Sequence, residues 1–135
     1  MPDAAKPRPQ FRNIHVTQIA KYRLPLAGLV SILHRISGLL MFLFLPFLLC
    51  LLDQSLASEN TFNSIREWSQ SVVVKLIILA LVWAYLHHFF AGLRHVAMDV
   101  HLGLGKDSAR HSAVGVLLIS IPVAALVGLK LFGVF

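Results

Sequence analysis

The stretch from Tyr85 to Asp99 carries most of the residues in this chain that could do chemistry. It closes a strongly apolar run with three histidines, an arginine and an aspartate. Ionisable groups at membrane depth are costly and usually serve a function. The stretch therefore indicates a working site, whose candidate members are His87, His88, Arg94, His95 and Asp99.

Helical geometry places His88, Gly92 and His95 on one face. At about 100° per residue, the three lie within about 60° of each other. Gly92 removes a side chain where a flat ligand would lie against the backbone, and His88 is suited to give an axial nitrogen to a haem iron. His95, about 10 Å further along the axis, is suited to a haem propionate.

Two other interpretations of these histidines remain open. His88 could instead hydrogen-bond a neighbouring helix or line a wet crevice. His87 points about 100° away from His88 and could be the ligand, although Gly92 and His95 would then lie off its face. The shared face of His88, Gly92 and His95 favours the haem interpretation.

A second polar cluster, formed by Ser31, His34 and Arg35, lies in the first apolar run. Ser31 and Arg35 are one helical turn apart, with His34 to the side. A hydroxyl donor beside a permanent cation is suited to polarising a carbonyl and supporting an anionic intermediate. Alternatively, Arg35 extends to lipid phosphates and Ser31 bonds its own helix backbone.

The composition indicates one small integral membrane domain. Of 135 residues, 57% are hydrophobic and 13% charged, and the mean hydropathy is +0.75. The apolar residues form long blocks, which a soluble domain of this size does not show. The net charge of +6 is explained by basic residues flanking membrane spans, so we predict a lipid environment and no nucleic-acid partner.

The predicted fold class is all-α, with a basic arm over residues 1–23 and a membrane domain over residues 24–135. Its three spans, up, down and up, are predicted at residues 24–52, 72–96 and 113–132. The prolines at positions 46 and 122 fall inside spans, which membrane helices tolerate. Between the first two spans, Ser64 and Glu67 match a capping box that could start a short interfacial helix.

The basic residues predict the orientation. Lys and Arg are frequent in the arm and in the second loop, and the first loop is acidic. The positive-inside rule then places the N-terminus on the cytoplasmic side. Because the first span starts and the second span ends at that face, the cluster of Ser31, His34 and Arg35 should lie level with the cluster of Arg94, His95 and Asp99.

Two ordered motifs resemble the cytochrome b556 family of succinate dehydrogenase membrane subunits. Residues 31–38 read Ser-Ile-Leu-His-Arg-Ile-Ser-Gly, and residues 88–99 read His-x-x-x-Gly-Leu-Arg-His-x-x-x-Asp. The likeness covers nearly the whole chain. It implies that His88 is an axial haem ligand and that Ser31 and Arg35 line a ubiquinone pocket. The haem propionates would lie near His34, Arg35 and His95, with Arg94 and Asp99 behind them.

The resemblance also implies partners. One haem b would be shared with a second membrane subunit that supplies the other axial histidine, so the chain would form half of a heterodimeric helical bundle. Covalent FAD and the iron–sulfur clusters would belong to a flavoprotein and an iron–sulfur subunit. The arm looks bacterial, which favours the bacterial inner membrane. The chain would then serve electron transfer from succinate to quinone as a subunit that is not catalytic alone.

Three alternatives are open from the sequence. The chain could be a haem-free structural anchor, or the anchor of a quinol:fumarate reductase. It could also be a proton-conducting subunit that uses its histidines as a relay. The last of these leaves Gly92 and the alignment of His95 unexplained.

Overall fold

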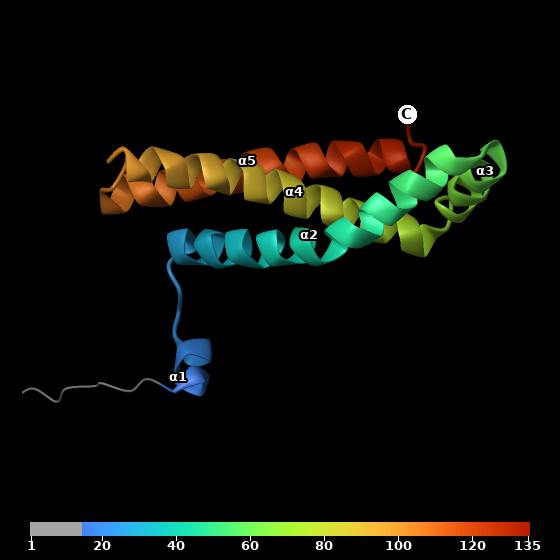
Figure 1. Ribbon diagram of the computed structural model, residues 1–135. Helices are drawn as coiled ribbons and strands as arrows, with labels where there is room; N and C mark the ends of the chain where they lie inside the picture. The colour runs from blue at the N-terminus through green and yellow to red at the C-terminus, as the bar shows by residue number, and fades with distance from the viewer. Residues whose placement is uncertain (1–14) are drawn as a thin grey trace, which may run out of the picture.

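The computed structural model describes residues 15–135, which form five helices and, within that range, no strand (Figure 1). They are α1 (Val16–Lys21), α2 (Leu26–Ala57), α3 (Glu59–Trp68), α4 (Val72–Asp99) and α5 (Lys106–Leu131). Three of them, α2, α4 and α5, are long and apolar enough to cross a membrane. The predicted all-α, multi-pass membrane fold is confirmed. Predictions for positions 1–14 of the arm lie outside the described residues.

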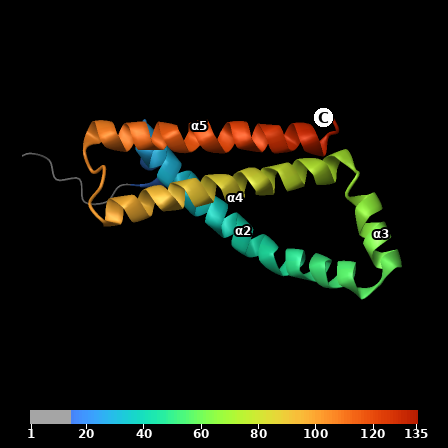
Figure 2. The same cartoon turned by 90° about the horizontal axis from the view of Figure 1, so that it is seen from above.

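The three long helices alternate in direction. Figures 1 and 2 show α4 and α5 running antiparallel side by side, with α2 crossing them. Beyond the crossing, α2 diverges from α4, and the short α3 joins the two separated ends (Figure 2). The start of α2, the end of α4 and the start of α5 therefore lie at one end of the bundle, and α3 lies at the other.

The observed helices outrun the predicted spans at their polar ends. The first continues to Ala57 instead of 52, the second to Asp99 instead of 96, and the third begins at Lys106 instead of 113. Hydropathy reports the thickness of the apolar layer, whereas the backbone keeps its helical hydrogen bonds past that layer. Pro46 and Pro122 both lie inside continuous helices.

The start of α3 corrects the predicted capping box. The cap is Ser58, whose Oγ accepts from the N–H of Thr61 at 3.2 Å, and Thr61 Oγ1 accepts from the N–H of Ser58 at 3.2 Å. Ser64 is already inside the helix, where its hydroxyl donates to the carbonyl of Asn60. A helix that starts six residues earlier uses a Ser-x-x-Thr pair, a weaker sequence signal than Ser-x-x-Glu.

The packed core is small, and small residues build it. Val30, Ala91, Ala113 and Val116 form its buried cluster, where α2, α4 and α5 meet. Most large apolar side chains lie on the outside; Phe42, for example, is 72% exposed. Packing through small residues is typical of helices in lipid, where apolar side chains need no burial within the protein.

Candidate functional site

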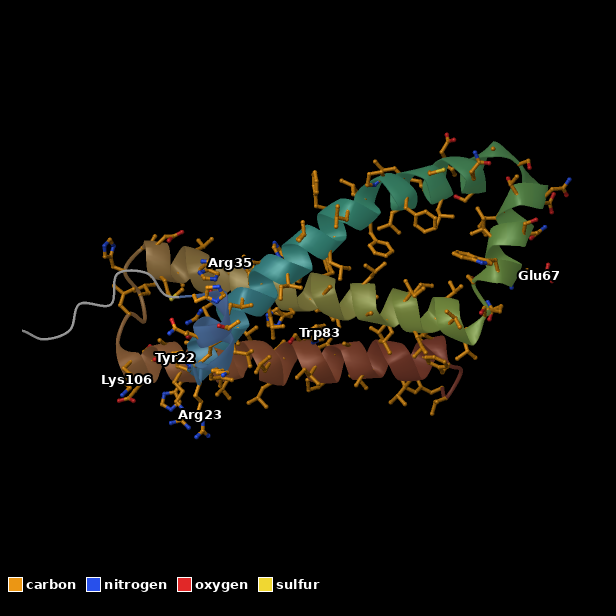
Figure 3. The ribbon with its side chains drawn as sticks, turned by 90° about the horizontal axis from the view of Figure 1, so that it is seen from below. Tyr22, Arg23, Arg35, Glu67, Trp83 and Lys106 are labelled. Carbon is orange, nitrogen blue, oxygen red and sulfur yellow. The ribbon has the colours of Figure 1, made fainter. Side chains whose placement is uncertain are left out.

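Three histidine rings gather where α2 crosses α4. His34 of α2 stacks on His88 of α4 with ring centres 4.1 Å apart and planes inclined by 17°. The ring centre of His34 also lies 4.9 Å from that of His95, which is about two helical turns beyond His88 on α4. Figure 3 shows Arg35 at the same crossing. The structure thus brings His34 and His95, which belong to the two predicted polar clusters, into contact.

The hydrogen bonds of His88 fix which of its nitrogens is free. Its Nδ1 lies 3.0 Å from the main-chain carbonyl oxygen of His34 and 3.3 Å from Oγ of Ser37. The Ser37 hydroxyl itself donates to the same carbonyl at 2.9 Å. Because a carbonyl only accepts, Nδ1 of His88 carries the proton. Nε2 therefore keeps its lone pair, and no partner occupies it within residues 15–135.

This arrangement matches that of a metal-ligating histidine. Such residues usually donate the second ring N–H to a carbonyl or carboxylate, which orients the ring and raises its basicity. The three rings do not form a site for a bare ion, since no group of three or more His, Cys, Asp or Glu in the described chain is placed to hold one. The cluster is suited to a single axial bond from His88.

Gly38 lets α2 approach this ring. A Cβ added at Gly38 would lie 2.7 Å from Cε1 of His88 and 3.2 Å from its Nδ1, so only glycine fits without displacing the ring. Gly92, in contrast, has room for a Cβ, which would make only an ordinary contact with Nε2 of His34, at 3.5 Å. The close approach to the ring therefore depends on Gly38, a residue of the first motif to which sequence reasoning gave no role.

Ser31 and Arg35 lie on α2 at the rim of the histidine cluster. Ser31 is half-buried and Arg35 is exposed. The side chain of Arg35 is therefore open to a ligand, and that of Ser31 is partly so. The structure neither joins them to the histidine rings nor covers them.

Arg94 turns away from the histidines and packs against α5. Its Nε donates to Oγ of Ser112 at 2.9 Å, and Nη2 donates to the carbonyl of Ala109 at 3.4 Å. Seven residues after His87, Arg94 shares the face of that residue and not the face of His88. Asp99, the last residue of α4, is exposed at the end of the helix.

His87 is the buried neighbour of the candidate ligand. Its side chain is fully buried, with Nε2 3.4 Å from the main-chain carbonyl of Val30 and the ring 5.3 Å from that of Trp83. The chain therefore separates its adjacent histidines, with His87 in the three-helix core and His88 at the half-exposed face.

An apolar groove of about 700 Å³, lined by residues of α2, α4 and α5, lies between the level of His88 and the α3 end of the bundle. Its α2 wall begins at Met41, one turn beyond Gly38, and its α4 wall includes Leu81 and Tyr85, on the turns before His88. Leu81 is seven residues before His88 and so shares its face. A polar rim on one side of His88 and an apolar groove on the other suit a flat ligand with one charged edge.

Comparisons with known proteins identify relatives of this chain. A family model described as the succinate dehydrogenase/fumarate reductase transmembrane subunit matches residues 6–127. The succinate dehydrogenase cytochrome b556 subunit of Coxiella burnetii is 33% identical over 111 residues, which cover 82% of this chain and 89% of the relative. The subunit of the same name from Paracoccus denitrificans is 32% identical over 105 residues, 78% of this chain and 81% of the relative.

Proposed function

Since this chain belongs to the succinate dehydrogenase/fumarate reductase transmembrane subunit family, we propose that it binds haem b and quinone as the membrane anchor of a succinate:quinone oxidoreductase. The chain is similar over most of its length to proteins named succinate dehydrogenase cytochrome b556 subunit. That similarity supports the succinate direction over fumarate reduction. It also supports membership in an oxidoreductase complex.

His88 is the residue that carries the haem proposal. Its Nδ1 is committed to the carbonyl of His34 at 3.0 Å, which leaves Nε2 as the free electron pair. A haem b bound there would supply one-electron redox chemistry. The propionates would be held by His34, Arg35 and His95, while Gly92 gives the macrocycle room beside α4. Asp99 stands behind this rim as a supporting charge.

Arg94 supports the site from the other side of α4. Its bond to Ser112 holds the end of α4 against α5. Since His95 follows directly in the chain, this anchor also fixes where the His95 ring can lie. The resemblance implies that Arg94 lies behind the propionates. We propose instead that it positions the end of α4.

Ser31 and Arg35 form the quinone-binding part of the proposal. The hydroxyl of Ser31 and the guanidinium of Arg35 are donors on one face of α2, one turn apart. Hydrogen bonds to a quinone carbonyl would polarise it, and the fixed positive charge of Arg35 would stabilise the oxygen as it gains electrons. Protons would come from water at the inner end of the bundle.

The proposal includes partner subunits in the membrane and at its inner face. A second membrane subunit would supply the other axial histidine, and the iron–sulfur subunit and flavoprotein would dock at the inner face. Lys21, Arg23, Lys106 and Arg110 mark the end of the bundle that holds the site. The positive-inside rule makes this end, and with it the N-terminus, cytoplasmic in a bacterial inner membrane.

A reduced-minus-oxidised absorbance spectrum of the purified complex tests the haem proposal. His88→Ala should remove the b-type signal while the subunits still co-purify. His111→Ala, at an exposed position on α5, is the matched control and should keep the signal. An unchanged signal in His88→Ala would refute the assignment.

The quinone proposal is tested with two electron acceptors. Ser31→Ala and Arg35→Gln should lower quinone reduction by the complex. Oxidation of succinate with a soluble dye that takes electrons from the partner subunits should stay unchanged. Equal loss with both acceptors would show damage to assembly instead of to a quinone site.

A further inference from the structure

Two buried polar atoms in the described part of the chain lack a hydrogen-bond partner: Nδ1 of His87 and Oγ of Ser120. Both side chains are fully buried, with 0% exposure. One belongs to α4 and the other to α5. Buried polar groups are almost always satisfied, so two such atoms in one small bundle require an explanation.

The register of α4 against α5 places these two residues opposite each other. Near the ends of the shared interface, Arg94 bonds Ser112, and Leu79 packs against Gly128. Ser120 lies midway between Ser112 and Gly128, and His87 lies midway between Arg94 and Leu79 to within one residue. In an antiparallel pair, His87 and Ser120 therefore lie at the same level.

Both residues also face the same interior. His87 belongs to the buried stripe of α4 that includes Ala84 and Ala91. Ser120 belongs to the buried stripe of α5 that includes Val116 and Ala124. Figure 3 shows Trp83, one turn before His87, midway along α4 where it runs beside α5. The two unpaired atoms thus belong to the same buried interface between α4 and α5.

The hydrogen positions of the pair are complementary. Nε2 of His87 faces the carbonyl of Val30, which only accepts, so Nε2 carries the proton and Nδ1 holds a lone pair. A serine hydroxyl can donate and accept. An acceptor on α4 and a donor on α5 therefore share a level, although they are not bonded directly.

We propose that one buried water bridges Ser120 Oγ and His87 Nδ1, and that His87 is thereby a positioning residue for the haem ligand. The water would donate to Nδ1 and bond the serine hydroxyl, which would satisfy both atoms. His87 then ties α4 to α2 through Val30 and to α5 through Ser120. These ties fix the rotation of α4 about its axis, and with it the direction of the adjacent His88.

A double-mutant cycle in the purified complex tests the link between the two residues. Ser120→Ala should shorten the half-life of the complex at a fixed elevated temperature, by roughly tenfold, because the water loses a partner. His87→Phe keeps a flat ring but has no polar atom. In that background Ser120→Ala should be neutral or lengthen the half-life, because the hydroxyl then has nothing to bond.

Ser112→Ala is the matched control, since Ser112 is also a serine of α5 but bonds Arg94. Its effect on the half-life should be the same with His87 and with Phe at position 87. If Ser120→Ala also has equal effects in both backgrounds, the bridge is refuted. The half-life assay does not depend on haem, so its failure can be told apart from a failure of the proposed function. The positioning role alone rests on the proposed function, in which His88 is the haem ligand.

The positioning role is tested by the midpoint potential of the haem. His87→Phe should retain haem but shift the potential, because the His88 ring changes its orientation and its bond to the His34 carbonyl. Gly128→Leu, which crowds Leu79 at the other end of the α4–α5 interface, should leave the potential unchanged even where it lowers thermal stability. A His87→Phe complex that is less stable but has an unaltered potential would reduce His87 to a packing residue and refute this part.

Discussion

Replacing Gly38 by alanine should displace the ring of His88 and alter the proposed haem site while leaving α2 helical. The new Cβ would lie 2.7 Å from Cε1 of His88, and ordinary Cβ contacts begin at 3.4 Å, so the ring must move by about 0.7 Å. It is held by the 3.0 Å hydrogen bond from Nδ1 to the His34 carbonyl and by the stacked His34 ring. A shift of that size can lengthen the bond beyond the range of a hydrogen bond.

The expected cost follows from these contacts. Overpacking of this kind costs about 1–3 kcal/mol. Alanine is more favourable than glycine in a helix by about 1 kcal/mol, which offsets part of that cost. Gly115→Ala is the matched control, because a Cβ there meets no atom within 4 Å and gains only the helix term. The two variants should therefore differ by about 1–3 kcal/mol, with Gly38→Ala the less stable.

The assay compares the two variants of the purified complex in haem content, haem midpoint potential and apparent melting temperature. Gly38→Ala should bind less haem or bind it at a shifted potential, and it should melt earlier than Gly115→Ala. Equal potential, haem content and melting temperature in the two variants would refute the reasoning. The His88 ring would then have more space beside position 38 than the structure shows.

Three further outcomes follow from other contacts. Ser37→Ala should keep the haem and shift its potential less than Gly38→Ala does, because the carbonyl of His34 still accepts from Nδ1 of His88. Loss of haem in the spectrum would contradict this. Removing the hydroxyl in Ser112→Ala should cost about 1.5–3 kcal/mol, seen as an earlier melting of the complex, because a charged donor loses its partner; unchanged melting would contradict it. Gly128→Leu should also lower the melting temperature, because even a Cβ there lies 3.2 Å from both methyls of Leu79. Gly128→Ala needs only a small shift of those methyls and should be close to neutral.

The sequence predicts the fold well because the length of the apolar blocks decides it. Apolar blocks of membrane length must be helical, since lipid offers no partner for an open backbone. The ends of the helices are less predictable, since nothing in hydropathy marks where hydrogen bonding stops. For that reason α5 begins at Lys106 within a stretch predicted as a loop.

The site is predictable only in part. Helical angles correctly group residues on one α4 face, but they do not say which neighbouring helix that face meets. Arg94 was therefore expected at the rim with His95, whereas it bonds Ser112 of α5. The role of Gly38 depends on an atom of His88, fifty residues away in the chain, and no local pattern carries that information.

The hydrogen-bond partner of His88 is a main-chain atom, the carbonyl oxygen of His34. Any residue at position 34 presents the same carbonyl, so substitution there cannot take the acceptor away. Only a movement of α2 relative to α4 can, and the bond of 3.0 Å would not survive a separation of much more than half an ångström. The basicity of His88 is thus set by the spacing of two helices. The absorbance spectrum and midpoint potential of a haem bound there would therefore report that spacing. They would respond to any change in the membrane that moves α2 relative to α4.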